Sequence, residues 1–286
     1  MPTSRVLIVP SNDSLDGPWN WRLPKGKKML NHIKTCVKPL VEKNVYLQYL
    51  GFICFYHCRF MLPHDLEYQG IAKLPLGDSG RDGILDIGAN MGLSALSFRK
   101  FFPKIKIMSI EPNPRHEDWL AKIKVVDRDF DYSMVGAGDA QGEFVLYLPY
   151  YRKVPLHTMA SIQYEALKRN CDEYYGANNK RIHIRSIQVD IVTIDQFKLS
   201  PEFIKIDAEN FEIPILRGAL ETIKRCKPCL FVENNNVRGM EDLLAPLGYE
   251  KCYWDTKGNR FTTQEIPARN VFFLPSAVLA ILPRQI

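Results

Sequence analysis

The sequence lacks a strong excess of either charge. Its 286 residues carry 38 Lys and Arg against 32 Asp and Glu, which leaves a net charge of +6. A surplus this small does not give the broad basic face that a protein needs to follow a phosphate backbone, and we expect no nucleic-acid partner. The chain also lacks internal repeats and low-complexity segments, and its hydrophobic fraction of 46% is ordinary for a globular protein with a buried core.

Long apolar runs are scarce as well. We expect no cleavable apolar leader at Met1, and the run from Val45 to Leu62 is about long enough to span a bilayer. Because that run contains Gln48, His57 and Arg59, which are costly in hydrocarbon, we interpret it as a buried or interfacial helix. Membrane contact through this run is the alternative.

Cysteine pairs are also few. The chain has seven cysteines, an odd number with one CxxC pair, and this pattern favours reduced thiols in a reducing compartment. We therefore predict a cytoplasmic protein. The sequence leaves its oligomeric state open.

Turn residues divide the chain near residue 80. Residues 1–80 are predicted to form a mainly helical N-terminal extension. Residues 81–286 then alternate short apolar runs with segments of helical spacing, beginning with a strand at 83–88 and a helix at 92–102. Alternation of this kind predicts an α/β domain in which a mostly parallel sheet has helices on both faces.

The first predicted strand runs into a turn that carries an acid and two glycines. The run from Asp86 to Gly92 lies where such a sheet binds ligands, beyond the end of a strand and before a helix N-terminus with free amide donors. It does not match GxGxxG, because the middle glycine is missing, and the carboxylate of Asp86 would repel a pyrophosphate. The same carboxylate suits the cationic S-adenosylmethionine, and Glu111, about one βα unit later, is placed to take both ribose hydroxyls. The predicted cofactor-binding residues are Asp86, Gly88, Ala89, Asn90, Gly92, Glu111, Pro112, Asn113 and Ala137.

Several ordered motifs connect the chain with a known family. They are DIGANMG (86–92), EPNP (111–114), VTIDQF (192–197), FIKIDAENFEIPILRGA (203–219) and LFVEN (230–234). Through these motifs the chain resembles the FkbM-type S-adenosylmethionine-dependent O-methyltransferases from about residue 83 to 275. The resemblance implies a class I methyltransferase fold, Rossmann-like with a seven-stranded sheet and an antiparallel last strand. It also implies activity on hydroxyls of sugars, glycans or natural products. The chain departs from the family at Asn210, where glycine is usual.

Carboxylates at two neighbouring strand ends are candidates for the chemistry. Methyl transfer to an alcohol needs a base beside the attacking oxygen, and we expect Asp207, Glu209 and Glu233 to face one crevice. His157, in the loop before these strands, is another candidate base. A second scheme gives Asp207, Glu233 and Asn234 to a Mg²⁺ or Mn²⁺ ion that acidifies the hydroxyl, which resembles the catechol-type methyltransferases.

The acceptor is expected to be a small molecule or a glycan. Tyr150, Tyr151, Arg152 and Lys153 crowd the loop that carries His157, and such a cluster can stack on a sugar ring and hydrogen-bond it. The alternative function is a S-adenosylmethionine-binding or scaffold protein without turnover. The simultaneous presence of Asp86, Glu111, Asp207 and Glu233 argues against that alternative.

Overall fold

The computed structural model describes residues 65–77, 81–156 and 159–282. The run from Val45 to Leu62, most of the predicted N-terminal extension and His157 lie outside these residues. Within the described part of the chain, no helix combines the length and the apolar character that crossing a membrane requires.

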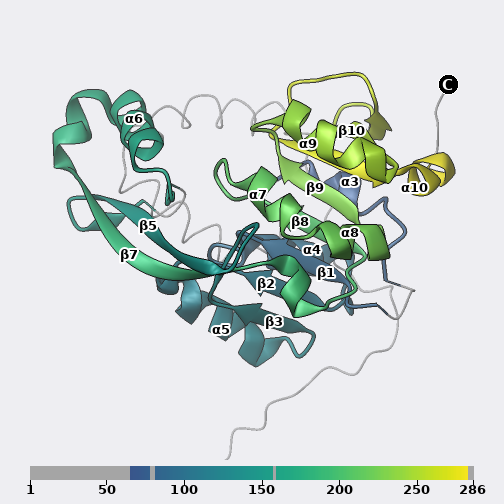
Figure 1. Cartoon of the computed structure of the whole chain (residues 1–286), viewed down its shortest axis with the longest axis horizontal. Helices are drawn as coiled ribbons and strands as arrows, with labels where there is room; N and C mark the ends of the chain where they lie inside the picture. Colours follow the sequence, from purple (N-terminus) through teal and green to yellow (C-terminus); the bar gives the residue numbers. More distant parts are fainter. Residues whose placement is uncertain (1–64, 78–80, 157–158, 283–286) are drawn as a thin grey trace, which may run out of the picture. The chain divides into compact units, whose positions relative to one another are not determined.

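The main sheet has eight strands in the order β11-β10-β12-β9-β8-β1-β2-β3 (Figure 1). These strands are β1 (Ile84–Ile87), β2 (Ile107–Ile110), β3 (Phe130–Ser133), β8 (Phe203–Ile206), β9 (Cys229–Glu233), β10 (Tyr249–Asp255), β11 (Arg260–Thr262) and β12 (Asn270–Pro275). The central strand β1 pairs in parallel with β2 and β8, whereas β12 runs antiparallel to both β9 and β10. This is a methyltransferase-like α/β fold. It has one strand more than the seven expected, because the short β11 pairs with β10 at the edge.

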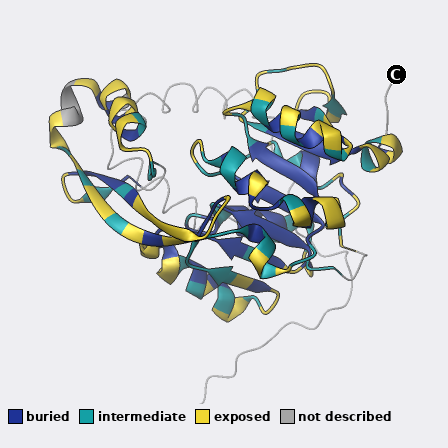
Figure 2. Ribbon diagram, viewed as in Figure 1, coloured by how far each residue is buried: buried dark blue, intermediate teal, exposed yellow. Residues whose placement is uncertain are grey.

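Helices cover both faces of the main sheet. The helices are α3 (Tyr68–Ile71), α4 (Leu93–Phe101), α5 (Glu117–Val126), α7 (Glu212–Arg217), α8 (Leu220–Cys226), α9 (Val237–Leu244) and α10 (Ser276–Ile281). Ile84 and Phe203 pack with side chains of α3, α4 and α5, whereas Leu85 and Ile204 pack with α7, α8 and α9. Alternate residues of a strand therefore enter two separate cores. Figure 2 shows the strands buried between helices whose outer faces are exposed.

The described part of the N-terminal extension packs into one of these cores. Tyr68 is 1% exposed and its ring stacks on Phe98 with 5.2 Å between the centroids. Glu67 accepts hydrogen bonds from the backbone where β12 begins. The domain boundary near residue 80 stays a prediction, but residues 65–77 share a core with the sheet.

A second sheet is inserted between β3 and β8 in the sequence, with the order β4-β7-β5-β6. Its members are β4 (Gly136–Ala137), β5 (Gly142–Tyr151), β6 (Val154–Pro155) and β7 (Ile182–Val192), and helix α6 (Tyr164–Tyr175) lies between β6 and β7. The long strands β5 and β7 pair antiparallel, and together they form the curved ribbon of Figure 1. Four short 3₁₀ helices complete the described elements: η1 (Pro114–His116), η2 (Gly176–Arg181), η3 (Ile194–Phe197) and η4 (Ala245–Leu247).

Candidate active site

A cavity of about 290 Å³ lies beyond the carboxyl ends of β1, β2, β8 and β9. Open α/β sheets bind their ligands at this position. The predicted site residues that line it are Gly88, Ala89, Asn90, Glu111, Pro112, Ala137, Asp207, Glu209 and Glu233. Four other predicted residues, Asp86, Gly92, Asn113 and Asn234, do not line it.

Packing within the protein requires glycine at both positions of the first turn, and the sequence alone did not reveal this. The sequence predicted both as cofactor-binding residues. Gly88 has a φ of 77°, and a Cβ there would lie 1.8 Å from the carbonyl oxygen of Asp207. Gly92 has a φ of 80°, and its Cβ would lie 2.4 Å from Cδ1 of Ile123 in α5. Close packing of the protein on itself therefore requires both glycines, and only Gly88 also faces the cavity.

Glu111 is held rigidly at the end of β2. Its side chain is buried, with Oε2 accepting from the backbone N–H of Asn90 at 2.7 Å and Oε1 accepting from that of Asn113 at 2.8 Å. The buried imidazole of His116 places Nδ1 3.3 Å from Oε1. Asn113 itself caps η1, because its side chain accepts from the backbone N–H of Arg115. Backbone donors thus fix the orientation of the Glu111 carboxylate before any ligand binds.

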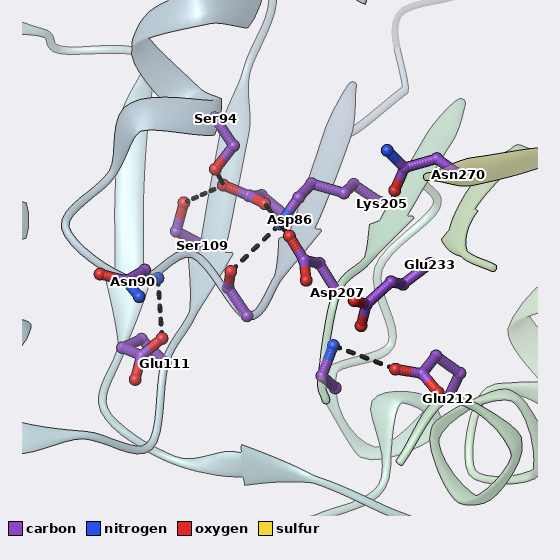
Figure 3. A network of polar contacts seen from close by, with 12 residues as sticks. Asp86, Asn90, Ser94, Ser109, Glu111, Lys205, Asp207, Glu212, Glu233 and Asn270 are labelled. Carbon is purple, nitrogen blue, oxygen red and sulfur yellow. Dashed lines mark hydrogen bonds and ion pairs between the residues drawn. The ribbon is translucent and has the colours of Figure 1, made fainter. Parts of the chain in front are cut away.

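Asp86 lies beneath the cavity and not in its wall. The side chain is fully buried, and its Oδ2 accepts from the hydroxyls of Ser94 and Ser109. Its Oδ1 pairs with the ammonium of Lys205 (Figure 3). Protein groups therefore already surround the carboxylate of Asp86, and its role toward the cofactor stays a prediction.

Lys205 connects Asp86 with the opposite side of the cavity. Its Nζ lies 3.2 Å from Oδ1 of Asp86 and 3.5 Å from Oδ2 of Asp207, and it donates to the carbonyl oxygen of Gly88 at 3.1 Å. Burial alone would lower the pKa of Lys205, but the two carboxylates outweigh burial and raise the pKa. The ammonium is therefore charged at neutral pH.

The backbone after β8 follows an unusual path. Glu209 and Asn210 have φ values of 48° and 75°, in the left-handed region that disfavours most side chains. Glu212 supports this loop, because its Oε1 accepts from the backbone N–H of Asn210 at 3.1 Å. The left-handed backbone explains why glycine suits position 210, and asparagine is among the residues that tolerate it best.

Carboxylates crowd the side of the cavity formed by the ends of β8 and β9. Burial and the nearby charges of Asp207 and Glu212 raise the pKa of Glu233 to about 7. Burial and the charges of Glu233, Asp207 and Glu212 raise the pKa of Glu209 to about 8. Glu209 is exposed to solvent, which screens part of this repulsion. Figure 3 shows Asp207 and Glu233 pointing into the same space.

The predicted metal site is not supported by the geometry. Among the described residues, no group of three or more His, Cys, Asp or Glu side chains could hold a metal ion. The amide of Asn234 donates to the carbonyl oxygen of Ala268 at 3.0 Å, and Asn234 does not line the cavity. The proposed set of Asp207, Glu233 and Asn234 is therefore not assembled as metal ligands.

Several residues that line the cavity escaped the sequence analysis: Asp65, Tyr68, His116, Lys205, Arg269 and Asn270. For Lys205 a signal existed. The third residue of each strand is polar in the apolar quartets ILDI, IMSI and FIKI, and the register aligns Asp86 with both Ser109 and Lys205. No local sequence pattern marks Asp65 or Asn270 as a cavity residue. The two segments meet through a contact between distant parts of the chain, in which Glu67 accepts a hydrogen bond at 2.8 Å from the side-chain amide of Asn270, about 200 positions away.

Comparisons with known proteins agree with this picture. A model of the methyltransferase FkbM domain matches residues 86–251. A solved structure of methyltransferase FkbM from Methylobacillus flagellatus KT is similar, with 14% identity over 87% of this chain and a TM-score of 0.44, and this chain covers 60% of its length. A precorrin-6y C5,15-methyltransferase from Geobacter metallireducens GS-15 is 12% identical over 74% of this chain and 88% of its own, with a TM-score of 0.38. No curated protein matches the chain.

Proposed function

The chain belongs to the methyltransferase FkbM domain family, and from that premise we propose that it transfers a methyl group from S-adenosylmethionine to a hydroxyl of a sugar, a glycan or a related natural product. One observation carries the proposal. A single cavity has an oriented carboxylate, Glu111, on one side and the acidic pair Asp207 and Glu233 on the other. We refer to these sides as the donor end and the acceptor end.

The donor end supports a bound nucleoside. A carboxylate oxygen can accept two hydrogen bonds, so Oε2 of Glu111, which accepts from the Asn90 N–H, can also accept from a ribose hydroxyl. Ala89, Pro112 and Ala137 add apolar lining at the same end. S-adenosylmethionine, when bound, supplies a methyl group on a cationic sulfur.

The acceptor end supports removal of a proton from an alcohol. A general base works best when its pKa lies near the working pH, and the pKa of Glu233 is about 7. Asp207 is held next to it by Lys205. In this scheme the hydroxyl of the acceptor gives its proton to one of these carboxylates while its oxygen bonds to the methyl carbon. The bond from that carbon to sulfur breaks, and the sulfur keeps the electron pair and leaves as a neutral thioether. Asp207 either takes the proton itself or orients the hydroxyl.

The donor assignment is tested by calorimetry with S-adenosylmethionine and its demethylated product. Glu111→Ala should weaken both ligands by about tenfold to a hundredfold, the scale of a lost hydrogen bond to a charged group. Glu117→Ala, an exposed acid in the first turn of α5, is the matched control and should bind like the wild type. Unchanged affinity in Glu111→Ala contradicts the assignment.

The acceptor class is tested by turnover. Incubation with methyl-labelled S-adenosylmethionine and a panel of sugars, oligosaccharides and polyketides should transfer label to at least one hydroxyl. Donor binding without transfer to any of the panel would favour the non-catalytic alternative. Transfer only to amines or thiols would contradict the choice of hydroxyl.

A further inference from the structure

Lys205 occupies a special position among the charged residues of the cavity. Of the described residues that line the cavity, two are permanent cations, Lys205 and Arg269. Arg269 is exposed, whereas the side chain of Lys205 is 3% exposed. A buried ammonium is costly unless it is paired, and here two carboxylates and one carbonyl oxygen surround it.

The contacts of Lys205 come from both ends of the cavity. Asp86 and Gly88 belong to the first strand and the turn of the donor end, and Asp207 belongs to the acceptor end. The strand register places Lys205 directly beside Asp86, so the contact is built into the sheet. Figure 3 shows the ammonium between the two aspartates.

We propose that Lys205 is a positioning residue that joins the two ends: its ammonium holds the Asp207 carboxylate against the donor turn and limits the negative charge that a cationic donor meets. With Lys205 present, its single positive charge offsets one of the two aspartate charges, and one negative charge remains. Without it, the charges of both carboxylates would be uncompensated, Asp86 in a fully buried position and Asp207 in the partly exposed wall of the cavity. This inference rests on the proposed function for the identity of the donor.

The charge of the donor gives a readout that a merely structural role would not move. S-adenosylmethionine carries a sulfonium charge, and the product that remains after methyl transfer lacks it. A general loss of packing weakens both ligands alike, so the ratio of their dissociation constants is unaffected. A change in the cavity's charge acts on the sulfonium alone and alters that ratio.

The experiment measures both dissociation constants by calorimetry for the wild type, Lys205→Met and Lys205→Arg. In Lys205→Met the preference for S-adenosylmethionine over the product should rise about tenfold, the scale of removing one charge about 6 Å away at an effective dielectric constant of about 40. Lys205→Arg retains the charge and should stay near the wild-type ratio. The matched control is Lys251→Met, which removes a lysine paired with Glu241 outside the cavity and should leave the ratio unchanged.

A second set of variants keeps the test decisive if Lys205→Met does not fold. Asp86→Asn should lower the preference for S-adenosylmethionine about tenfold, and the double variant Asp86→Asn with Lys205→Met should restore it. An unchanged ratio in Lys205→Met, or a double variant that fails to restore it, overturns the inference alone. Failure of the wild type to bind either ligand overturns the proposed function, and this inference falls with it.

Discussion

The carboxylates at the donor end and at the acceptor end of the cavity have different surroundings. At the donor end, backbone N–H groups orient Glu111. At the acceptor end, Glu209 and Glu233 repel each other and their neighbours, and the pKa of each is raised. Glu209 also has a left-handed backbone that disfavours its side chain.

Under the proposed function, this difference separates donor binding from chemistry. A site that must hold one ligand geometry gains from donors that are fixed beforehand. A site that must accept a proton gains from a carboxylate whose charged form is disfavoured, because its pKa then lies near neutral pH. The comparison therefore predicts that substitutions at the two ends change different measurements.

The largest expected effect comes from Asp207→Asn. Turnover with an accepted substrate should fall by about a hundredfold or more, the scale of losing a general base or the group that orients the hydroxyl. Affinity for the demethylated product, which lacks the sulfonium charge, should stay within about threefold of the wild type, since Asp207 lies at the acceptor end. Steady-state kinetics and calorimetry measure the two quantities.

The control for this variant is Asp242→Asn, an exposed acid on α9. It should leave both quantities unchanged. Turnover near the wild-type rate in Asp207→Asn would mean that the chemistry lies at another strand end, and a large loss of affinity for the demethylated product would mean that the two ends are not separable.

The next effect is a pH dependence that acts on turnover and stability in opposite directions. Turnover needs an unprotonated carboxylate, so it should rise by up to about tenfold per pH unit below a pKa of about 7, the value for Glu233. A carboxyl group whose pKa is raised by folding stabilises the protein while it is protonated. That contribution is complete below pH 4.5 and is lost as pH rises through about 7 for Glu233 and about 8 for Glu209.

Melting temperatures measured between pH 5 and pH 9 check the stability part. The wild type should lose stability across this range more steeply than Glu233→Gln, in which the carboxyl group is replaced and its repulsion of Glu209 is removed. Equal slopes for the two proteins would contradict the crowding of charge at the acceptor end.

The sequence revealed the donor end better than the acceptor end, and the reason is the separation of the contacts. The turn after β1 and the acid at the end of β2 are local features of one βα unit, so Gly88, Asn90 and Glu111 were predicted together, and all three line the cavity. Asp86 was also predicted but does not line the cavity, and its partner Lys205 lies more than a hundred positions away in the sequence.

The acceptor end depends on backbone geometry and on strand register, which no local pattern specifies. The amide of Asn234 turns toward Ala268, so the predicted metal ligands do not assemble. Asp65 and Tyr68 reach the cavity because α3 packs on the sheet, a contact that the division of the chain near residue 80 hid. The sequence showed that the third residue of β1, β2 and β8 is polar. Only the strand register showed that these three residues lie side by side.

The smallest expected effect concerns Asn210, the position at which the chain departs from its family. Its φ of 75° suits glycine and, next to glycine, asparagine. Asn210→Gly should therefore change the free energy of unfolding by less than about 0.5 kcal/mol, because the relief of backbone strain is offset by the greater freedom of glycine in the unfolded chain. Asn210→Ala should destabilise by about 1 kcal/mol, since alanine pays the left-handed penalty without compensation. Urea unfolding separates the two.

Both Asn210 variants also sharpen the comparison between the ends of the cavity. Asn210 follows Glu209 in the loop that Glu212 supports at the acceptor end, and it does not line the cavity. Donor affinity should therefore stay within about twofold of the wild type in both variants, whereas turnover should fall in Asn210→Ala, because a shifted loop displaces the Glu209 carboxylate. If Asn210→Gly weakened the donor by about tenfold, the backbone after β8 would have to reach the donor end, and the separation of binding from chemistry would not hold.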